Sequence, residues 1–152
     1  MRNTYGLDAT DYAILRELEA DGKLTNVELA DRVGLTPAPC LRRVKRLQDD
    51  GVIAGYRARL NPDVVGRAFC VYMAVEITMT SREVVEAFEK EVVTFEEVTE
   101  VRRTYGATDY LIRVEVEDSN AYERFQSEKM YALPAIHRIT SHPTMRLIKS
   151  NS

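Results

Sequence analysis

Residues 34–47 read GLTPAPCLRRVKRL, a tight turn that leads into a basic helix. Thr36 is a predicted N-cap, because its hydroxyl can accept a hydrogen bond from a free backbone N–H in the first turn. Pro37 and Pro39 fit only at the very start of a helix, where the N–H that they lack is not needed. The pattern therefore predicts a helix that begins directly after Thr36.

The helical period separates this segment into two faces. Cys40, Val44 and Leu47 recur at i, i+4 and i+7, which is the spacing of a buried face. The opposite face carries a small residue followed by three cations: Ala38, Arg42, Lys45 and Arg46. A helix with this distribution suits the major groove of DNA. The alternative is an ordinary amphipathic helix whose basic face is solvated.

The segment upstream favours DNA binding. Thr25 and Glu28 have the T-x-x-E spacing of a capping box, which predicts a second helix. Gly34 follows that helix at the position that takes the left-handed backbone conformation. A first helix is expected to begin after Asp8 and to end near Asp21. Two short helices joined by a tight glycine turn, the second of them basic, indicate a helix-turn-helix unit.

A connector follows the helices. Residues 52–60 alternate well enough to predict a strand. Arg57 and Arg59 would share one face of that strand. This face could lie along a DNA backbone, or it could be a solvated edge, and the sequence favours neither alternative. Pro62 and Gly66 mark a boundary. The predicted organisation is a DNA-binding domain at 1–51, a linker at 52–66 and a second domain at 67–152.

The second half of the chain repeats one pattern. Helices are predicted after a capping box at Thr80 and Glu83, and after Asp118. Pro143 argues against a central place for the last strand. The order β-α-β, tight turn, β-α-β predicts an α+β, ferredoxin-like βαββαβ domain with both helices on one face of an antiparallel sheet. The four predicted strands cover residues 69–78, 98–105, 110–116 and 136–148.

The other face of this sheet is expected to be buried against another surface. The residues predicted to face away from the helices include Cys70, Tyr72, Ala74 and Leu111. A bare apolar sheet face usually has a partner, and DNA half-sites suit a two-fold protein. We therefore expect a homodimer that is joined through this domain.

Composition excludes several classes of protein. The chain has 152 residues, 45 % of them hydrophobic, and a net charge of −3. Between Arg42 and Arg59, however, there are six cations and two anions. The attraction of phosphate depends on this local positive charge and not on the net charge of the chain. Cys40 and Cys70 lie far apart without a C-x-x-C or a His/Cys cluster, so neither a disulfide nor a zinc site is predicted. With no recognisable signal peptide or membrane span, we expect a cytoplasmic protein without a cofactor or a membrane partner.

With both halves considered, the chain resembles the Lrp/AsnC family of leucine-responsive, or feast/famine, transcription regulators of bacteria and archaea. The resemblance extends from Leu7 to Lys149. The helix-turn-helix string ending at Leu47 is its most specific part. Further matching groups are Leu7-Asp8 with Asp11, Ile14 and Leu15; Gly51-Val52-Ile53 with Gly55 and Tyr56; Gly66; and residues 106–111.

The resemblance implies a winged-helix-like helix-turn-helix domain joined to a ferredoxin-like ligand-sensing domain. It implies binding to double-stranded DNA, and dimers that assemble further, commonly to octamers. The residues then expected to contact DNA, with Arg43 and Arg57 on phosphate, are Thr36, Ala38, Pro39, Arg42, Arg43, Lys45, Arg46 and Arg57. The residues expected around a small effector, usually an amino acid bound between dimers, are Tyr105, Gly106, Thr108, Asp109, Tyr110, Ser141, His142 and Thr144.

The turn at residues 106–110 has suitable chemistry for a free amino acid. Backbone N–H groups exposed beside Gly106 can hold a carboxylate, and Asp109 can accept from an α-ammonium group. The alternative role for Asp109 is to stabilise a hairpin turn. His142 and Thr144 are more polar than the apolar stretch of leucine-binding relatives, which favours a polar effector over leucine.

The predicted function is sequence-specific transcription regulation, with DNA binding or assembly modulated by the effector. One alternative is an architectural DNA-binding protein that has no effector. An enzyme is not expected, because His137, His142, Asp109 and Cys70 belong to no recognisable catalytic motif and a ferredoxin-like fold alone proves no chemistry.

Overall fold

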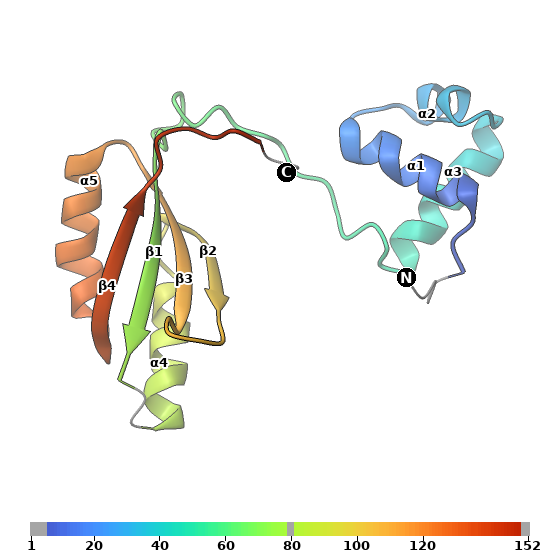
Figure 1. Ribbon diagram of the computed structural model, residues 1–152. Helices are drawn as coiled ribbons and strands as arrows, with labels where there is room; N and C mark the ends of the chain where they lie inside the picture. The colour runs from blue at the N-terminus through green and yellow to red at the C-terminus, as the bar shows by residue number, and fades with distance from the viewer. Residues whose placement is uncertain (1–5, 79–80, 150–152) are drawn as a thin grey trace. The chain divides into compact units, whose positions relative to one another are not determined.

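The computed structural model describes residues 6–78 and 81–149. The chain divides into two compact units, Met1–Ala58 and Arg59–Ser152, and each has its own hydrophobic core. Figure 1 shows the helices of the first unit and the sheet of the second.

The first unit is built from three helices, α1 (Ala9–Ala20), α2 (Asn26–Arg32) and α3 (Pro37–Asp49). Its core is small, and Val44 of α3 is half-buried against it. The predicted helix-turn-helix is confirmed. The buried core side chains are Ile14, Leu29, Ala30, Cys40 and Leu47.

Side chains cap the first two helices as predicted. The Asp8 carboxylate accepts from the N–H of Asp11 at 2.8 Å, and the Asp11 carboxylate accepts from the N–H of Asp8 at 3.1 Å. Thr25 and Glu28 form the corresponding reciprocal box at the start of α2. Gly34 has a φ of +68°, the left-handed conformation expected where α2 ends.

Thr36 occupies the N-cap of α3, but the hydrogen bond predicted from its hydroxyl is absent. A capping side chain bonds to the N–H of the second or third helical residue. Here the third residue is Pro39, which has no N–H. The turn is instead held from α2, where Asn26 Nδ2 donates to the carbonyl of Pro37 at 2.7 Å. Proline geometry and α2 therefore define the start of α3.

The strand predicted over residues 52–60 does not form. A strand needs hydrogen-bonding partners along its edge, and within the described residues the paired strands all belong to the sheet of the second unit. Ile53 packs on the helix-turn-helix core, and its N–H donates to Leu47 O at 2.9 Å. The Tyr56 ring lies over Gly22, where an added Cβ would be 3.1 Å from Tyr56 Cδ1.

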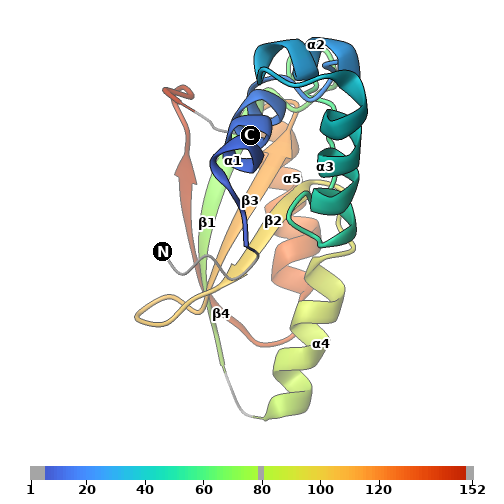
Figure 2. The same cartoon turned by 90° about the vertical axis from the view of Figure 1, so that its right-hand side faces the viewer.

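The second unit is a four-stranded antiparallel sheet with its helices on one face (Figures 1 and 2). The strands are β1 (Phe69–Ile77), β2 (Val98–Arg103), β3 (Tyr110–Val116) and β4 (Ile136–Pro143), in the order β2-β3-β1-β4. The helices are α4 (Arg82–Val92) and α5 (Ser119–Arg124), and α5 continues as a π-helical turn (Phe125–Lys129) and a 3₁₀ turn (Met130–Ala132). The predicted ferredoxin-like arrangement is confirmed.

Strand alternation places the core of this unit between the sheet and the helices. Val71 and Val75 of β1 are fully buried in one cluster with Phe88 of α4 and Phe125 of the π-helical turn. The intervening residues of β1 face the opposite side, as the period of two requires.

Two strand ends differ from the prediction because of pairing. β4 ends at Pro143 rather than at residue 148, since β1 begins at Phe69 and offers no partner beyond that point. Thr144 still donates its N–H to Cys70 O at 2.9 Å. β2 ends at Arg103 rather than at residue 105, where the chain enters the turn to β3. The position of β4 at the edge of the sheet agrees with the expectation from Pro143.

The start of α4 also differs. Its N-cap is Ser81, whose hydroxyl accepts from the N–H of Val84. The capping box was predicted one residue earlier, at Thr80, which lies outside the described residues. β1 ends at Ile77, one residue before its predicted end.

The two threonine caps differ in a measurable way. Thr25→Ala should lower the free energy of unfolding by about 0.5–2 kcal/mol, because it removes a capping hydrogen bond. Thr36→Ala should change it by less than about 0.5 kcal/mol, because no such bond is lost. Urea denaturation of the full chain, followed by circular dichroism, compares the two. Equal losses would show that the Thr36 hydroxyl also caps its helix.

Candidate DNA-binding and effector sites

One stripe of α3 is exposed along its length. Ala38, Arg42 and Lys45, all predicted at DNA, are exposed on it. Leu41 lies on the same stripe and is 57 % exposed. At about 100° per residue, these four side chains fall within roughly 100° of the helix circumference, opposite the buried Leu47. The stripe therefore presents two cations and two apolar groups to the outside, and Asp49 lies in the same sector at the last residue of the helix.

Leu41 was missed by reasoning from the sequence. Its spacing of three residues from Ala38 and four from Lys45 places it on the predicted DNA face. An apolar residue in an amphipathic helix is normally assigned to the core, and only the packing of α1 and α2 elsewhere on α3 leaves Leu41 outside. An exposed apolar side chain on such a face can contact a thymine methyl group.

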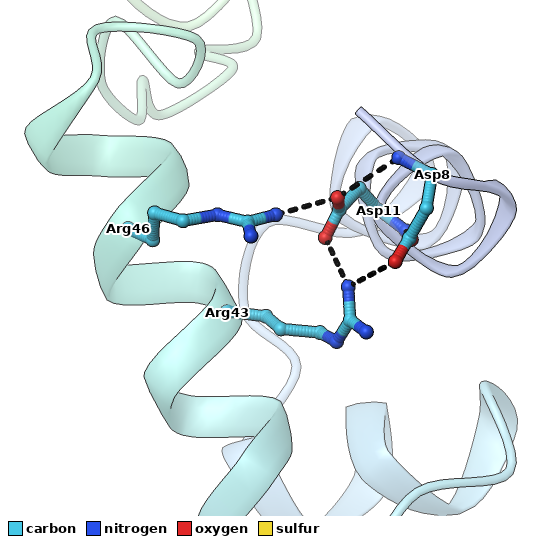
Figure 3. A network of polar contacts seen from close by, with 4 residues as sticks. All are labelled: Asp8, Asp11, Arg43 and Arg46. Carbon is cyan, nitrogen blue, oxygen red and sulfur yellow. Dashed lines mark hydrogen bonds and ion pairs between the residues drawn. The ribbon is translucent and has the colours of Figure 1, made fainter. Parts of the chain in front are cut away.

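The four cations of α3 have different surroundings. Arg42 and Lys45 have no carboxylate within ion-pair distance among the described residues. Arg43 and Arg46 both turn towards α1 and contact Asp11, as Figure 3 shows. The helix therefore carries two free cations and two that are paired with carboxylates, of which Arg46 remains 48 % exposed.

The contacts of the held arginines are short. Arg43 Nη1 lies 2.7 Å from Asp8 Oδ2 and 2.8 Å from Asp11 Oδ1. Arg46 Nη2 lies 2.5 Å from Asp11 Oδ2. The Asp11 side chain is 0 % exposed, so both of its oxygens are shielded from water and are satisfied by α3 and by the N–H of Asp8.

Electrostatics agree with this geometry. The backbone N–H of Asp11, followed by the Arg43 guanidinium, lowers the pKa of the Asp8 carboxyl below its usual value. The two carboxylates, Asp8 first, raise the pKa of Arg43. Both effects favour the charged forms of Asp8 and Arg43.

The remaining residues predicted at DNA lie in different surroundings. Thr36 is exposed at the start of α3, and Pro39 is half-buried in its first turn. Arg57 is exposed in the irregular segment after the helices rather than on a strand.

In the second unit, the predicted effector turn is closed by its own backbone. The N–H of Thr104 donates to Asp109 O at 2.8 Å, and the Thr104 hydroxyl donates to Thr108 O. Gly106 has a φ of +135°, which favours glycine, and Tyr105 at the tip is fully exposed.

Asp109 has one oxygen in use and one free. Its Oδ2 accepts from the N–H of Ile77 at 2.8 Å, and its own N–H donates to Val75 O at 3.1 Å. No described residue donates to Oδ1. Asp109 therefore has a structural role near the turn, as the alternative from the sequence proposed. Its Oδ1 can still accept a hydrogen bond.

Tyr110 lies in the core rather than beside the turn. Its ring packs on Phe88 with centroids 4.9 Å apart, and its hydroxyl donates to Glu89 Oε1 at 2.6 Å. Burial, with the Glu89 carboxylate next, raises the pKa of Tyr110 to about 12. The alternation of β3 turns Tyr110 towards the helices.

The three predicted residues of the last strand point in different directions. Ser141 faces the helices, where its Oγ lies 2.6 Å from the hydroxyl of Tyr122. His142 pairs in register with Tyr72, on the opposite face of the sheet. Thr144 donates its hydroxyl to Cys70 O at 3.0 Å.

The sheet register also separates these residues along the strands. Asp109 contacts Val75, whereas Thr144 contacts Cys70, five residues away on β1. At about 3.3 Å per residue this is roughly 16 Å, more than a free amino acid spans. One chain therefore does not bring the turn and Thr144 into one pocket.

Two clefts in the second unit lie away from the turn. One, of about 410 Å³, is lined by residues that include Glu97, Glu115 and Lys129. The other, of about 420 Å³, lies beside Arg82 and Glu89 of α4. None of the predicted effector residues lines either cleft.

Within residues 6–78 and 81–149, no group of three His, Cys, Asp or Glu side chains is placed to hold a metal ion. The same part of the chain has no helix that is both long enough and apolar enough to cross a membrane.

Two family profiles match the chain. The winged helix-turn-helix DNA-binding profile covers residues 7–54, and the Lrp/AsnC ligand binding domain covers residues 70–152. The leucine-responsive regulatory protein of Escherichia coli (strain K12) is 37 % identical over 146 residues, which cover 96 % of this chain and 89 % of that protein.

Two solved structures are similar over nearly their whole length. One is a transcriptional regulator from Neisseria meningitidis in complex with L-Met, 35 % identical, covering 95 % of this chain and 93 % of that chain with a TM-score of 0.91. The other is an AsnC family transcriptional regulator from Agrobacterium tumefaciens, 37 % identical, covering 95 % and 94 % with a TM-score of 0.89. These relatives are regulators and not enzymes. The chain belongs to the Lrp/AsnC family of DNA-binding transcription regulators.

Proposed function

We propose that this regulator binds the major groove of double-stranded DNA through the exposed stripe of α3. The observation that carries the proposal is the pair of free cations, Arg42 and Lys45, on a stripe that also holds Ala38 and Leu41 and has Asp49 only at its last residue. A small residue lets the helix approach base edges, and arginine can bond two acceptors of one guanine.

The flanks of α3 complete the proposed contact surface. Thr36 and Pro39 stand at its first turn, where a helix N-terminus favours a phosphate group. Arg57 is free to reach phosphate from the following segment. Arg43 and Arg46 are left out of this surface, because both guanidinium groups are already engaged by carboxylates.

Arg42 is the proposed base reader. Arg42→Ala should relax base preference at one operator position, at a cost of about 1–3 kcal/mol there if the contact with guanine is bidentate. Footprinting on a library of randomised sites measures this, with Arg16→Ala as the control because Arg16 is exposed on α1. Weaker binding with unchanged preference would make Arg42 a backbone contact.

We also propose that a free amino acid binds at the turn around Gly106 and modulates DNA binding. The free Oδ1 of Asp109 would accept from the α-ammonium group, and N–H groups beside Gly106 would hold the carboxylate. The L-Met complex of the Neisseria relative supports an amino acid as the ligand class. Since one chain does not gather the turn and Thr144, the last-strand residues would come from a second chain.

Asp109 can be tested without losing its structural bond. In Asp109→Asn the side-chain oxygen can still accept from Ile77 N–H, but the charge is gone, which should weaken binding by about 1.5–3 kcal/mol. Calorimetry with L-Met, leucine and asparagine measures this, and Asp118→Asn, which changes an equivalent capping carboxylate on α5, is the control.

The outcomes separate the alternatives. Equal binding by the wild type and by Asp109→Asn would remove the proposed site. A preference of the wild type for L-Met or leucine over asparagine would leave the site in place but contradict the reading of His142 and Thr144 as selectors of a polar effector. No binding at all would favour the architectural function.

The open face of the sheet is the proposed interface between copies of the chain. Tyr72 is 44 % and Leu111 41 % exposed there. Arg113 Nε, on the same face, is buried without a hydrogen-bond partner among the described residues, so it lacks an acceptor. A second chain would cover this face and supply one, giving a dimer that assembles further, up to an octamer. The free cysteines Cys40 and Cys70 suit the reducing cytoplasm.

A charge on the open face should disrupt this assembly. Tyr72→Arg should lower the mass of the full chain in light scattering, because its cation would lie opposite Arg113 in the sheet and would be buried in the interface without a carboxylate partner. Tyr131→Arg is the matched control, since Tyr131 is 59 % exposed on the helix side. A Tyr72→Arg protein with the mass of the wild type would place the interface elsewhere.

A further inference from the structure

We infer that Asp11 is a positioning residue for DNA recognition: it holds Arg43 and Arg46 on the α1 flank of α3, so that Arg42 and Lys45 alone present the positive charge of the helix to DNA. This inference rests on the proposed use of α3 as the DNA-binding helix. It reverses the expectation from the sequence, which counts every cation of α3 towards DNA.

The direction of the side chains is the first step. Arg43 follows Arg42 by about 100° of helix rotation and therefore leaves the exposed stripe. Figure 3 shows Arg43 and Arg46 reaching from two successive turns of α3 to the same end of α1. There Asp11 accepts one guanidinium group on each oxygen, at 2.8 Å and 2.5 Å.

The burial of Asp11 makes this arrangement hard to exchange. Its side chain is 0 % exposed, whereas that of Asp8 is 51 % exposed. A buried carboxylate that loses a cationic partner is strongly destabilising, because water cannot replace the lost contact. A phosphate that drew Arg43 or Arg46 away would leave Asp11 under-compensated. The two arginines are therefore retained by the protein when DNA is near.

The same contacts set the rotation of α3. Arg43 and Arg46 are separated by three residues, and both are fixed to one carboxylate on α1. A roll of α3 about its axis would break at least one of these bonds. Asp11 thereby determines which residues of α3 face outward, and through them which bases are read.

Salt dependence distinguishes held cations from free ones. Each phosphate neutralised on duplex DNA contributes about 0.9 to the slope of log affinity against log salt. Lys45→Gln should reduce that slope by about 0.9 per bound chain, whereas Arg42→Gln should relax base preference. Both variants should leave the melting temperature unchanged. Arg43→Gln and Arg46→Gln should lower the melting temperature and leave the slope unchanged.

Asp11→Asn provides the opposite test. It removes the charge that holds both arginines, so the slope should become steeper by up to about 1.8 per chain. The ratio of affinity for a selected site to affinity for random duplex should fall at the same time, because α3 is no longer held in one rotation. Loss of packing alone would not steepen the slope.

The measurements use the full chain, a site selected from a random library by the wild type, and a random-sequence duplex. If Asp11→Asn does not fold, the comparison of Arg43→Gln and Arg46→Gln with Lys45→Gln still decides the question. Asp8→Asn is a matched control, because asparagine keeps the cap and removes a charge from Arg43 while Asp11 still holds that arginine, so its slope should equal that of the wild type.

Each outcome has a defined meaning. If Arg43→Gln or Arg46→Gln reduces the slope as much as Lys45→Gln, the inference is overturned while α3 remains the DNA-binding helix. If Lys45→Gln leaves the slope unchanged and Arg42→Gln leaves base preference unchanged, α3 is not the DNA-binding surface, and the proposed function fails with the inference.

Discussion

The helix-turn-helix unit depends on the neutralisation of one buried carboxylate. Asp11 is the third residue of α1, where it closes a capping box with Asp8, and the packing of α3 then removes it from water. Such a group is tolerated only with cationic partners, which Arg43 and Arg46 provide. Because the apolar core of this unit is small, these charged contacts share with it the task of fixing α3 on α1.

One consequence is that charge on a recognition helix is not equivalent to charge available for DNA. Arg42 and Arg43 are neighbours in sequence, yet one faces solvent and the other a buried aspartate. A similar separation operates in the second unit. Ser141 and His142 are also neighbours, and strand alternation sends them to opposite faces of the sheet. A ligand site that uses both ends of that sheet needs more than one chain.

Much of the fold followed from local patterns. The cap at Asp8, the capping box at Thr25, the left-handed glycine at Gly34 and the order of strands and helices are all confirmed. These features depend on residues close together in the sequence, or on a simple alternation of buried and exposed positions. The family could be predicted from the helix-turn-helix string that ends at Leu47, because this string is long and specific.

The sequence by itself therefore determined the family, the two-domain plan and the position of each helix and strand to within a few residues. Tertiary structure alone decided which cations of α3 are free, that residues 52–60 have no partner strand within the described chain, and that Asp109 and Thr144 of one chain do not share a pocket. The periodicity of a sequence predicts which way a side chain points from its own helix or strand. The residue that this side chain contacts belongs to another helix or strand, distant in sequence, and only the packing of the two decides it.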